Sequence, residues 1–406
     1  MGSEQMRRAA CTIVSLNYLP YARVLCTSYL RHHPGWAFYV LLVDRLPGGV
    51  DLAQEEFGLE LVENLEIPNF QSVAFKYDVL ELNTNVKPTF LKSLFARGFD
   101  QVVYLDPDIF VYQELESVFS ALQEHAIVVT PHSLSPNPDD IQSEVIFLMG
   151  GVFNLGFVAL SKCAETDRFL SWWEQRCLDF AYNEPRKGMF VDQKWMNLVP
   201  CFFDKVKILK QPGCNMAFWN LHERHLSSEN GSLTVNQTCP LEFFHFSGIS
   251  VDGGDQLSRR RCPYTLANRP DLRPIYEDYR ARLLQSGFRE FKTRGYAFGT
   301  FENGQHINHL TRSLFAANIG RFEGEDPFNC SSRFYAWAKS SRLLSARDSS
   351  NSYSSETYSK GDFRLRMVHS MFRLALRILG ADRYSVLLKY LSYVSILRNQ
   401  RDVFTV

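Results

Sequence analysis

Short apolar runs alternate with segments of helical spacing over about the first 250 residues. Residues 11–16, 36–43 and 101–105 are apolar runs of the length of buried strands. Residues 21–31 repeat apolar positions every three or four residues, which indicates a helix. This alternation predicts a mixed α/β sheet flanked by helices. Further strands are expected at 59–62, 126–130, 153–160, 206–209 and 241–246, and further helices at 70–82, 87–96, 165–182, 192–198 and 275–284.

Polar residues follow the ends of these predicted strands. Asn17, Asp44 and Asp106 each come directly after an apolar run. Ligands of open α/β sheets bind at the carboxyl ends of the strands. We therefore expect a binding site where these three residues lie.

Two aspartates interrupt the apolar stretch 102–112. Asp106 and Asp108 flank Pro107, and the residues before and after them are apolar. Burying two acids is unfavourable unless positive charge meets them. A divalent cation such as Mn²⁺ or Mg²⁺ fits, because carboxylates are hard oxygen ligands. The alternative is that Asp-Pro-Asp only turns the chain.

The composition is that of an ordinary globular protein. The chain has 406 residues, of which 45% are hydrophobic and 22% charged. Lys plus Arg and Asp plus Glu both number 44, so no overall attraction to nucleic acid is expected. The nine cysteines lack paired CxxC spacing, which argues against a zinc site or a disulfide framework. With no apolar leader and no run of membrane-spanning length, we expect a cytoplasmic protein.

The last part of the chain differs in composition from the rest. A serine-rich stretch at 340–361 predicts a linker. Residues 363–401 then hold eight Lys or Arg against the single acid Asp382, with Arg366, Arg373 and Arg377 on one side of an apolar helix. Such a helix either docks on the body of the protein or lies on an anionic membrane surface. The breadth of its apolar arc favours docking.

Five short patterns occur in order along the chain. Together they resemble the metal-dependent glycosyltransferases of the Rossmann-like GT-A fold, most closely the glycogenin-like group and related bacterial sugar transferases. The resemblance covers residues 11–250, and each pattern alone is weak. The patterns are Asp106-Pro107-Asp108, Gly150 to Gly156, Phe190-Val191-Asp192-Gln193, Asn215 to Asn220, and His245-Phe246-Ser247-Gly248.

The resemblance implies a site for a nucleotide-sugar, most simply a UDP-sugar. It implies that Asp106, Asp108 and His245 hold Mn²⁺ or Mg²⁺, that Asp106 also reaches the ribose, and that Gly248 belongs to the diphosphate segment. The lysine that often follows this segment in glycogenin-like enzymes is absent. Lys87 is the substitute that we name, the alternative being a solvated lysine at a helix start.

The remaining candidates are expected around the donor. Asn154, Asp192 and Gln193 match positions that contact donor-sugar hydroxyls near the reacting carbon; a turn Asn and a helix N-cap are the alternatives for the first two. Asn17 and Tyr18 match the segment that cradles the base. His132, Trp219 and Asn220 are weaker candidates for the donor pocket and the acceptor side.

These expectations add up to an enzyme that moves a sugar from a nucleotide-diphosphate donor to a hydroxyl of a glycan, lipid-linked or protein acceptor, with retention of configuration. Two alternatives stay open. One is a haloacid-dehalogenase-like phosphoryl-transfer enzyme that uses Asp106 and Asp108, and the other is a non-catalytic sugar-binding module. No nucleic-acid partner is expected, and membrane contact through 363–401 is the alternative to docking.

The resemblance and the composition together imply a domain organisation. We expect a GT-A catalytic core at 1–250, an accessory region at 251–339 packed on it, the linker at 340–361, and a helical extension of basic amphipathic helices at 362–406.

Overall fold

The computed structural model describes residues 6–48, 52–229, 231–344 and 363–404. The chain forms two compact units: the first comprises Met1–Pro68 and Val79–Ala297, and the second comprises Asn69–Asp78 and Phe298–Val406. Most of the predicted linker 340–361 lies outside the described residues. The division into four domains stays a prediction.

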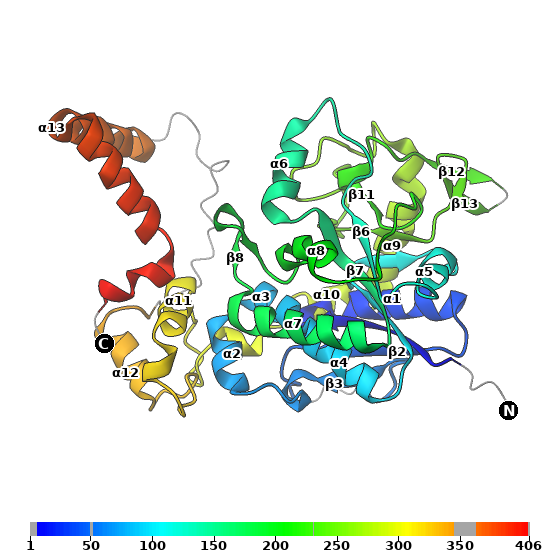
Figure 1. The fold of residues 1–406 in the computed structure, drawn as a ribbon, viewed down its shortest axis with the longest axis horizontal. Helices are drawn as coiled ribbons and strands as arrows, with labels where there is room; N and C mark the ends of the chain where they lie inside the picture. Colours follow the sequence, from blue (N-terminus) through cyan, green and yellow to red (C-terminus); the bar gives the residue numbers. More distant parts are fainter. Residues whose placement is uncertain (1–5, 49–51, 230, 345–362, 405–406) are drawn as a thin grey trace. The chain divides into compact units, whose positions relative to one another are not determined.

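A seven-stranded mixed sheet forms the centre of the first unit (Figure 1). Its strand order is β10-β6-β7-β4-β1-β2-β3. Within this sheet, β7 runs antiparallel to both of its neighbours, β4 and β6, whereas the other pairs are parallel. The expected mixed α/β sheet is confirmed. The strands are β1 (Arg8–Val14), β2 (Ala37–Leu42), β3 (Gly58–Leu61), β4 (Gln101–Leu105), β6 (Ile127–Pro131), β7 (Phe153–Ser161) and β10 (Val206–Ile208).

Helices cover both faces of this sheet, which is why its inner strands are apolar at nearly every position. On one face, alternate residues such as Val103 and Leu105 pack with α1 (Leu19–His32). On the other face, Tyr104 points toward α4 (Lys87–Ala96), which packs on α7 (Ala164–Phe180). The remaining helices of this unit are α3 (Val79–Asn85), α5 (Glu116–Ala121), α6 (Ile141–Gly150), α8 (Val199–Phe202), α9 (Arg273–Gln285) and α10 (Phe288–Phe291).

A second, small sheet continues from the end of β4. Its order is β11 (Met216–Ala217), β15 (Phe243–His245) and β5 (Ile109–Val111). β5 follows β4 after only three residues, and β15 pairs antiparallel with it so that His245 lies opposite Ile109. This register brings a residue late in the unit to the aspartate pair. Short peripheral strands are β8 (Asn183–Glu184), β9 (Met189–Phe190), β12 (Leu226–Glu229), β13 (Ser232–Val235) and β14 (Cys239–Pro240).

The second unit is built around phenylalanine. The ring of Phe75 on α2 (Phe70–Lys76) is surrounded by four other phenylalanine rings. Its centroid lies 4.9–5.6 Å from the centroids of Phe301, Phe315, Phe328 and Phe334. Arg312 donates to the carbonyl oxygens of Phe75 and Tyr77 at 2.7 and 2.8 Å, which satisfies the carboxyl end of α2. The other helices of this unit are α11 (His309–Ala317), α12 (Arg333–Ser340) and α13 (Phe363–Val394).

Two predicted helices differ from those found. Residues 70–82 form two helices, α2 and α3, because Tyr77 between them is extended (φ −106°, ψ 143°). Residues 192–198 contain a 3₁₀ helix over Lys194–Leu198. All nine cysteines are free, and none of the described helices is both long and apolar enough to cross a membrane.

His33, at the end of α1, ties that helix to the segment after β5. Its side chain is 1% exposed, its Nε2 accepts from the backbone N–H of Leu115 at 3.1 Å, and its Nδ1 therefore donates to the carbonyl of Tyr29 at 3.0 Å. Burial lowers the pKa of His33 from 6.5 to about 4, helped by the charge of Arg8. The neutral ring is thus part of the folded structure.

Protonating His33 should therefore favour unfolding. Because the folded pKa lies below the unfolded pKa, this contribution is fully present above pH 6.5 and is lost as the pH falls toward 4. When the pH is lowered from 7 to 5, the free energy of unfolding should fall in both chains. We expect the fall to be about 1 to 2 kcal/mol smaller in His33→Gln than in the unmodified chain. Urea unfolding measures this. His225→Gln, at an exposed histidine, is the control and should show the unmodified pH dependence.

Candidate metal and donor site

Asp106 and Asp108 lie in a tight turn between β4 and β5. The N–H of Asp106 donates to the carbonyl of Gly156 on β7 at 2.7 Å, and the N–H of Ile109 donates to the carbonyl of Asp106 at 3.0 Å. The backbone therefore fixes the direction of both carboxylates. As the resemblance implied, β15 delivers His245 to the same place.

The three side chains converge. Nε2 of His245 lies 2.9 Å from Oδ1 of Asp108 and 3.9 Å from Oδ2 of Asp106. One ligand atom from each of the three residues lies within 4.8 Å of the others. Two carboxylate oxygens and one imidazole nitrogen form a donor set that fits Mn²⁺ or Mg²⁺.

The charges of these groups depend on one another. Burial disfavours the imidazolium form of His245, but the charges of Asp108 and Asp106 outweigh burial and raise its pKa. Burial likewise disfavours the carboxylate of Asp108, but His245 outweighs this and lowers the pKa of Asp108. The two acids thus favour the charged form of His245, and a bound cation would supply positive charge to them in its place.

Two neighbours hold this group in shape. Tyr104 donates its hydroxyl to Oδ1 of Asp106 at 2.7 Å. Gly156 lies against His245: a Cβ at this position would overlap Cε1 of the ring and lie 2.8 Å from Nδ1. The ring is 3% exposed and has little room to move, so glycine is required here for the close approach of β7.

A buried ion pair lies behind Tyr104. Nζ of Lys87 is 2.6 Å from Oδ2 of Asp192, donates to the carbonyl of Leu155 at 2.9 Å, and lies 4.1 Å from the centre of the Tyr104 ring. Lys87 and Asp192 are each 1% exposed, so the alternative of a solvated lysine is wrong. Burial, with the charge of Asp106, raises the pKa of Asp192, and Lys87 opposes the rise.

Asn154 and Gln193 meet at the start of β7. Gln193 accepts from the N–H of Leu155 at 3.0 Å and donates to the carbonyl of Gly150 at 3.1 Å. Oδ1 of Asn154 accepts from the N–H of Gly156 at 3.2 Å and from Asn215 at 3.0 Å. Both amides therefore shape the backbone that lies against His245.

The weaker candidates gather beside this layer. Nδ2 of Asn154 is 3.3 Å from Nε2 of His132, and Asn220 donates to the carbonyl of His132 at 3.1 Å. Burial lowers the pKa of His132 to about 4, so its ring is neutral near pH 7. Trp219 packs edge to face on both His132 and His245, with centroids 5.5 and 5.1 Å apart.

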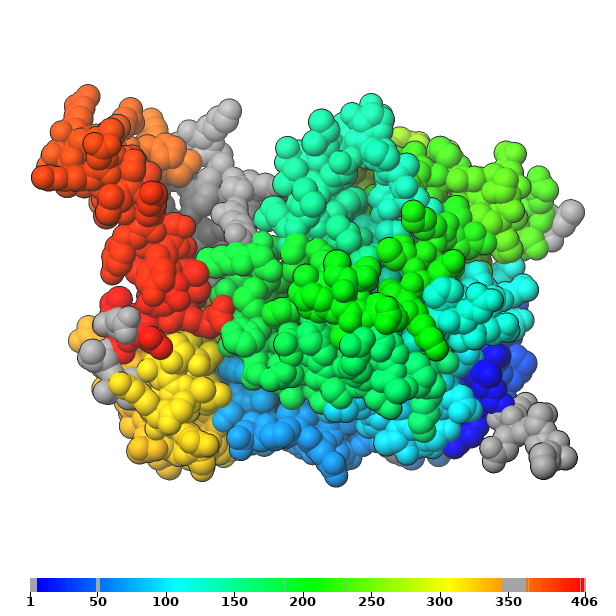
Figure 2. Space-filling model, in the orientation of Figure 1, coloured from blue at the N-terminus to red at the C-terminus, as the bar shows by residue number. Residues whose placement is uncertain are grey.

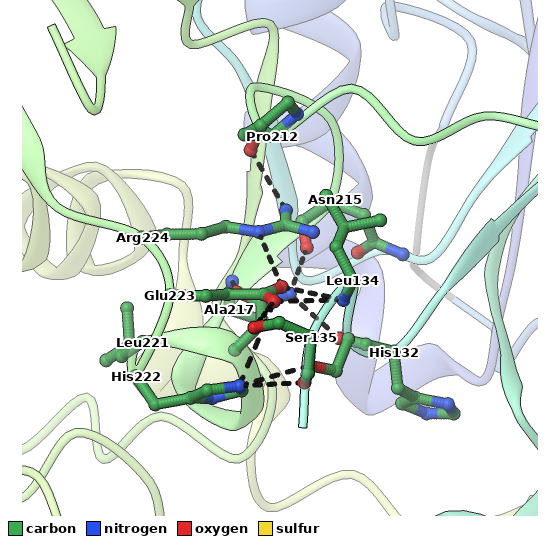
Figure 3. A network of polar contacts seen from close by, with 12 residues as sticks. His132, Leu134, Ser135, Pro212, Asn215, Ala217, Leu221, His222, Glu223 and Arg224 are labelled. Carbon is green, nitrogen blue, oxygen red and sulfur yellow. Dashed lines mark hydrogen bonds and ion pairs between the residues drawn. The ribbon is translucent and has the colours of Figure 1, made fainter. Parts of the chain in front are cut away.

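A polar network that the sequence did not reveal fastens the loop after His132 (Figure 3). The carboxylate of Glu223 accepts from the N–H of Leu134 at 2.8 Å and from the hydroxyl of Ser135 at 2.6 Å. Arg224 extends the network by donating to the carbonyls of Pro212 and Cys214 at 2.9 and 2.8 Å. The loop after β6 is thereby bound to the segment that carries Trp219.

The residues expected to bind the nucleotide base lie at the end of β1. Asn17 accepts from the hydroxyl of Ser15 at 2.7 Å, and half-buried Tyr18 stacks on Tyr21 with centroids 4.7 Å apart. Burial raises the pKa of Tyr18, and the charge of Asp108 adds to this. The charge of the candidate metal ligand Asp108 thus acts on Tyr18. Asp44, the other polar residue at a strand end, has a structural role. Its carboxylate accepts hydrogen bonds from backbone N–H groups, among them those of Leu16 and Ala297 at 3.2 and 2.8 Å.

Arg259 and Arg260 are further residues that the sequence reasoning missed. Gly248 adopts φ +73°, and its carbonyl accepts from the N–H of Arg259 at 2.8 Å, so the segment returns to the site. The charge of Arg260 acts to lower the pKa of both Asp108 and His245, and both arginines act on Tyr18. Three consecutive arginines at 259–261, shortly after Gly248, were the available signal.

No family model matches the chain. The uncharacterized protein YfnF of Bacillus subtilis (strain 168) is 24% identical over 285 residues, which cover 69% of this chain and 94% of YfnF. The glycosyltransferase GlyE of Streptococcus pneumoniae TIGR4 is 16% identical with a TM-score of 0.41, covering 76% of this chain and 73% of GlyE. The galactosyltransferase LgtC, solved with donor and acceptor sugar analogs, is 14% identical with a TM-score of 0.40, covering 67% of this chain and 95% of LgtC. At such identities and TM-scores, these likenesses carry no conclusion about activity.

Gly156→Ala should weaken metal binding without removing a ligand. The new methyl group would displace the His245 ring, and we expect Mn²⁺ affinity to fall about 10- to 100-fold, the usual effect of disturbing groups that orient a ligand. Calorimetric titration with Mn²⁺ measures this. Gly295→Ala, where a Cβ has no neighbour within 4 Å, is the control and should bind Mn²⁺ as the unmodified chain does.

Lys87→Met should leave the buried carboxylate of Asp192 without its ionic partner. Removing one partner of a buried ion pair costs about 3 to 5 kcal/mol of unfolding free energy, and replacing Asp192 as well, by Asn, should recover part of that loss. Urea unfolding of the two variants tests this. If the double variant proved less stable than Lys87→Met, the ion pair would not be what holds Lys87 in place.

Proposed function

We propose that the protein is a metal-dependent glycosyltransferase that moves a sugar from a nucleotide-diphosphate donor, in the simplest case a UDP-sugar, to a hydroxyl acceptor. The observation that carries this proposal is the convergence of Asp106, Asp108 and His245 at the carboxyl end of β4. The carboxyl end of a strand in an open α/β sheet is where ligands of this class bind.

Mn²⁺ fits this donor set better than Mg²⁺. Carboxylates suit both ions, but imidazole is a softer ligand than Mg²⁺ prefers. Asp106, Asp108 and His245 would hold the ion, with Tyr104 keeping the carboxylate of Asp106 in position. When bound, the ion would offset the negative charge that develops on the departing diphosphate.

The residues around the metal ligands suggest how the donor lies. Asn17 and Tyr18 would contact the base, with Asp106 also reaching the ribose. Arg259 and Arg260 would donate to the diphosphate beside Gly248, because guanidinium groups match phosphate oxygens in geometry and charge. We assign them this role in place of Lys87, which is 1% exposed and paired with Asp192.

The donor sugar would lie near the start of β7. We propose that Asn154, Asp192 and Gln193 form this part of the site, with Gln193 acting through the backbone of Gly150 and Leu155 that it holds. Lys87 would position Asp192 and keep its charge balanced.

The burial of Asp192 favours retention of configuration. An inverting enzyme needs a carboxylate that reaches the acceptor hydroxyl opposite the leaving group. Asp192 is the carboxylate that we considered for such a base, but it is 1% exposed and paired with Lys87. With no such base at this position, the acceptor hydroxyl would attack the donor sugar on the same face from which the diphosphate departs.

The acceptor is proposed as a glycan hydroxyl, whether free, lipid-linked or on a protein, as in polysaccharide biosynthesis. We place the enzyme in the cytoplasm, where nucleotide-sugars are available to it. Two other functions could use parts of the same site. A phosphatase would use Asp106 as a nucleophile, and a sugar-binding module would bind the sugar without catalysing a reaction.

A screen of nucleotide-sugars separates these functions. In the absence of acceptor, we expect slow Mn²⁺-dependent hydrolysis of one donor, and its loss on addition of chelator. Asp108→Asn should lower this rate at least about 100-fold, since it weakens binding of the ion that offsets the leaving-group charge. Released nucleoside diphosphate is the quantity measured.

Asp179→Asn is the matched control, because Asp179 is an exposed acid on α7 away from the site. It should hydrolyse the donor at the unmodified rate. Release of phosphate from phosphomonoesters with no nucleotide-sugar turnover would instead assign a phosphatase. Donor binding without turnover of any donor or phosphomonoester would assign a binding module.

A further inference from the structure

The C-terminal helix α13 has apolar residues that no described part of its unit covers. It consists of two helical segments, 363–379 and 381–394, which meet at Gly380 with φ +73° and ψ 168°. Among the described side chains from 363 to 404, none is in the buried class. The part of the chain that follows α13 is fixed in place, because η9 (Leu397–Asp402) packs on α11. The helix is thus attached to the second unit after its last turn.

The first segment carries an exposed apolar stripe. Its residues follow one another at intervals of three or four, which places them on one helix face. Such a face would normally be buried against another element. Its members, with their exposed fractions, are Phe363 (65%), Met367 (54%), Met371 (63%), Leu374 (57%) and Ile378 (72%).

The second segment is apolar and aromatic at its surface. Val386, Tyr390 and Tyr393 are 65%, 57% and 54% exposed. Tyrosine combines an apolar ring with a polar hydroxyl, and it is enriched where one end of a side chain meets lipid and the other meets water.

Positive charge accompanies this apolar surface. Whereas the whole chain is neutral, residues 363–401 hold eight Lys or Arg and one acid, Asp382. Arg366, Arg373 and Arg377 are separated by seven and four residues and therefore share the flank next to the stripe. The basic residues are Arg364, Arg366, Arg373, Arg377, Arg383, Lys389, Arg398 and Arg401.

We propose that α13 lies on an anionic membrane surface, with the apolar stripe at the acyl boundary and the arginines among the lipid phosphates (Figure 2, orange and red residues). Charge complementarity selects this partner. A second copy of the chain would bring the same excess of positive charge against the first and be repelled. An anionic lipid surface satisfies both the apolar stripe and the arginine flank.

Vesicle sedimentation of the full chain, without nucleotide-sugar, tests this surface. We expect binding to vesicles of phosphatidylglycerol mixed with phosphatidylcholine and little binding to phosphatidylcholine alone. Replacing Arg366, Arg373 and Arg377 by Ala should lower the partition coefficient about 100-fold. The same charge change at exposed Arg31, Lys207 and Arg289 is the matched control and should lower it by less than about threefold.

A second variant tests the apolar stripe separately from its charge. Met371→Gln with Leu374→Gln and Ile378→Gln keeps every arginine, and we expect it to lose at least about tenfold in partition coefficient. Equal binding to both vesicle types, or undiminished binding by the arginine variant, would overturn the proposal. So would a dimer, seen by sedimentation velocity without lipid, that the glutamine variant dissociates. The donor site plays no part in these measurements, so they stand whether or not the sugar-transfer proposal does.

Discussion

The mutual repulsion of two acids at the end of a buried strand is the constraint on which the site depends. Asp106 and Asp108 are separated only by Pro107, and both carboxylates face the same small volume. Such a pair persists in a folded protein only if positive charge reaches it. The small sheet meets this need, because the pairing of β15 with β5 fixes His245 beside Asp108.

Tyr104 connects this group to a second buried charge pair. Its hydroxyl donates to Asp106, while the ammonium group of Lys87 lies over its ring and binds Asp192. The proposed metal ligand Asp106 and the proposed donor-sugar residue Asp192 are therefore linked through two side chains, those of Tyr104 and Lys87. Since a cation over an aromatic ring is favourable when water is excluded, the ring lowers the cost of burying Lys87.

The sequence predicted the elements whose signal is local. The apolar run before Asp106 could be located because strand burial acts over a few residues. The turn considered for Asn154 was wrong, because Asn154 lies within β7 (Phe153–Ser161). The ion pair of Lys87 could not be located, because Asp192 lies 105 positions away and nothing near Lys87 in the chain predicts its burial. The separation of α2 from α3 at the extended residue Tyr77 was missed for a similar reason, because α2 packs through Phe75 on phenylalanines that begin at Phe301. Arg259 and Arg260 were visible as a charge run, but only the turn at Gly248 brings them back to the aspartates.

The membership of α2 in the second unit has a consequence for synthesis of the chain. Ten residues, 69–78, leave the ribosome early, yet the phenylalanines that enclose Phe75 come from residues 301–334. Until those residues emerge, Phe75 lacks the rings that enclose it in the folded protein and stays available to chaperones or to other nascent chains. The order of synthesis is thus not the order in which the units are completed. The packing of α2 is complete only after residues 301–334 have been made.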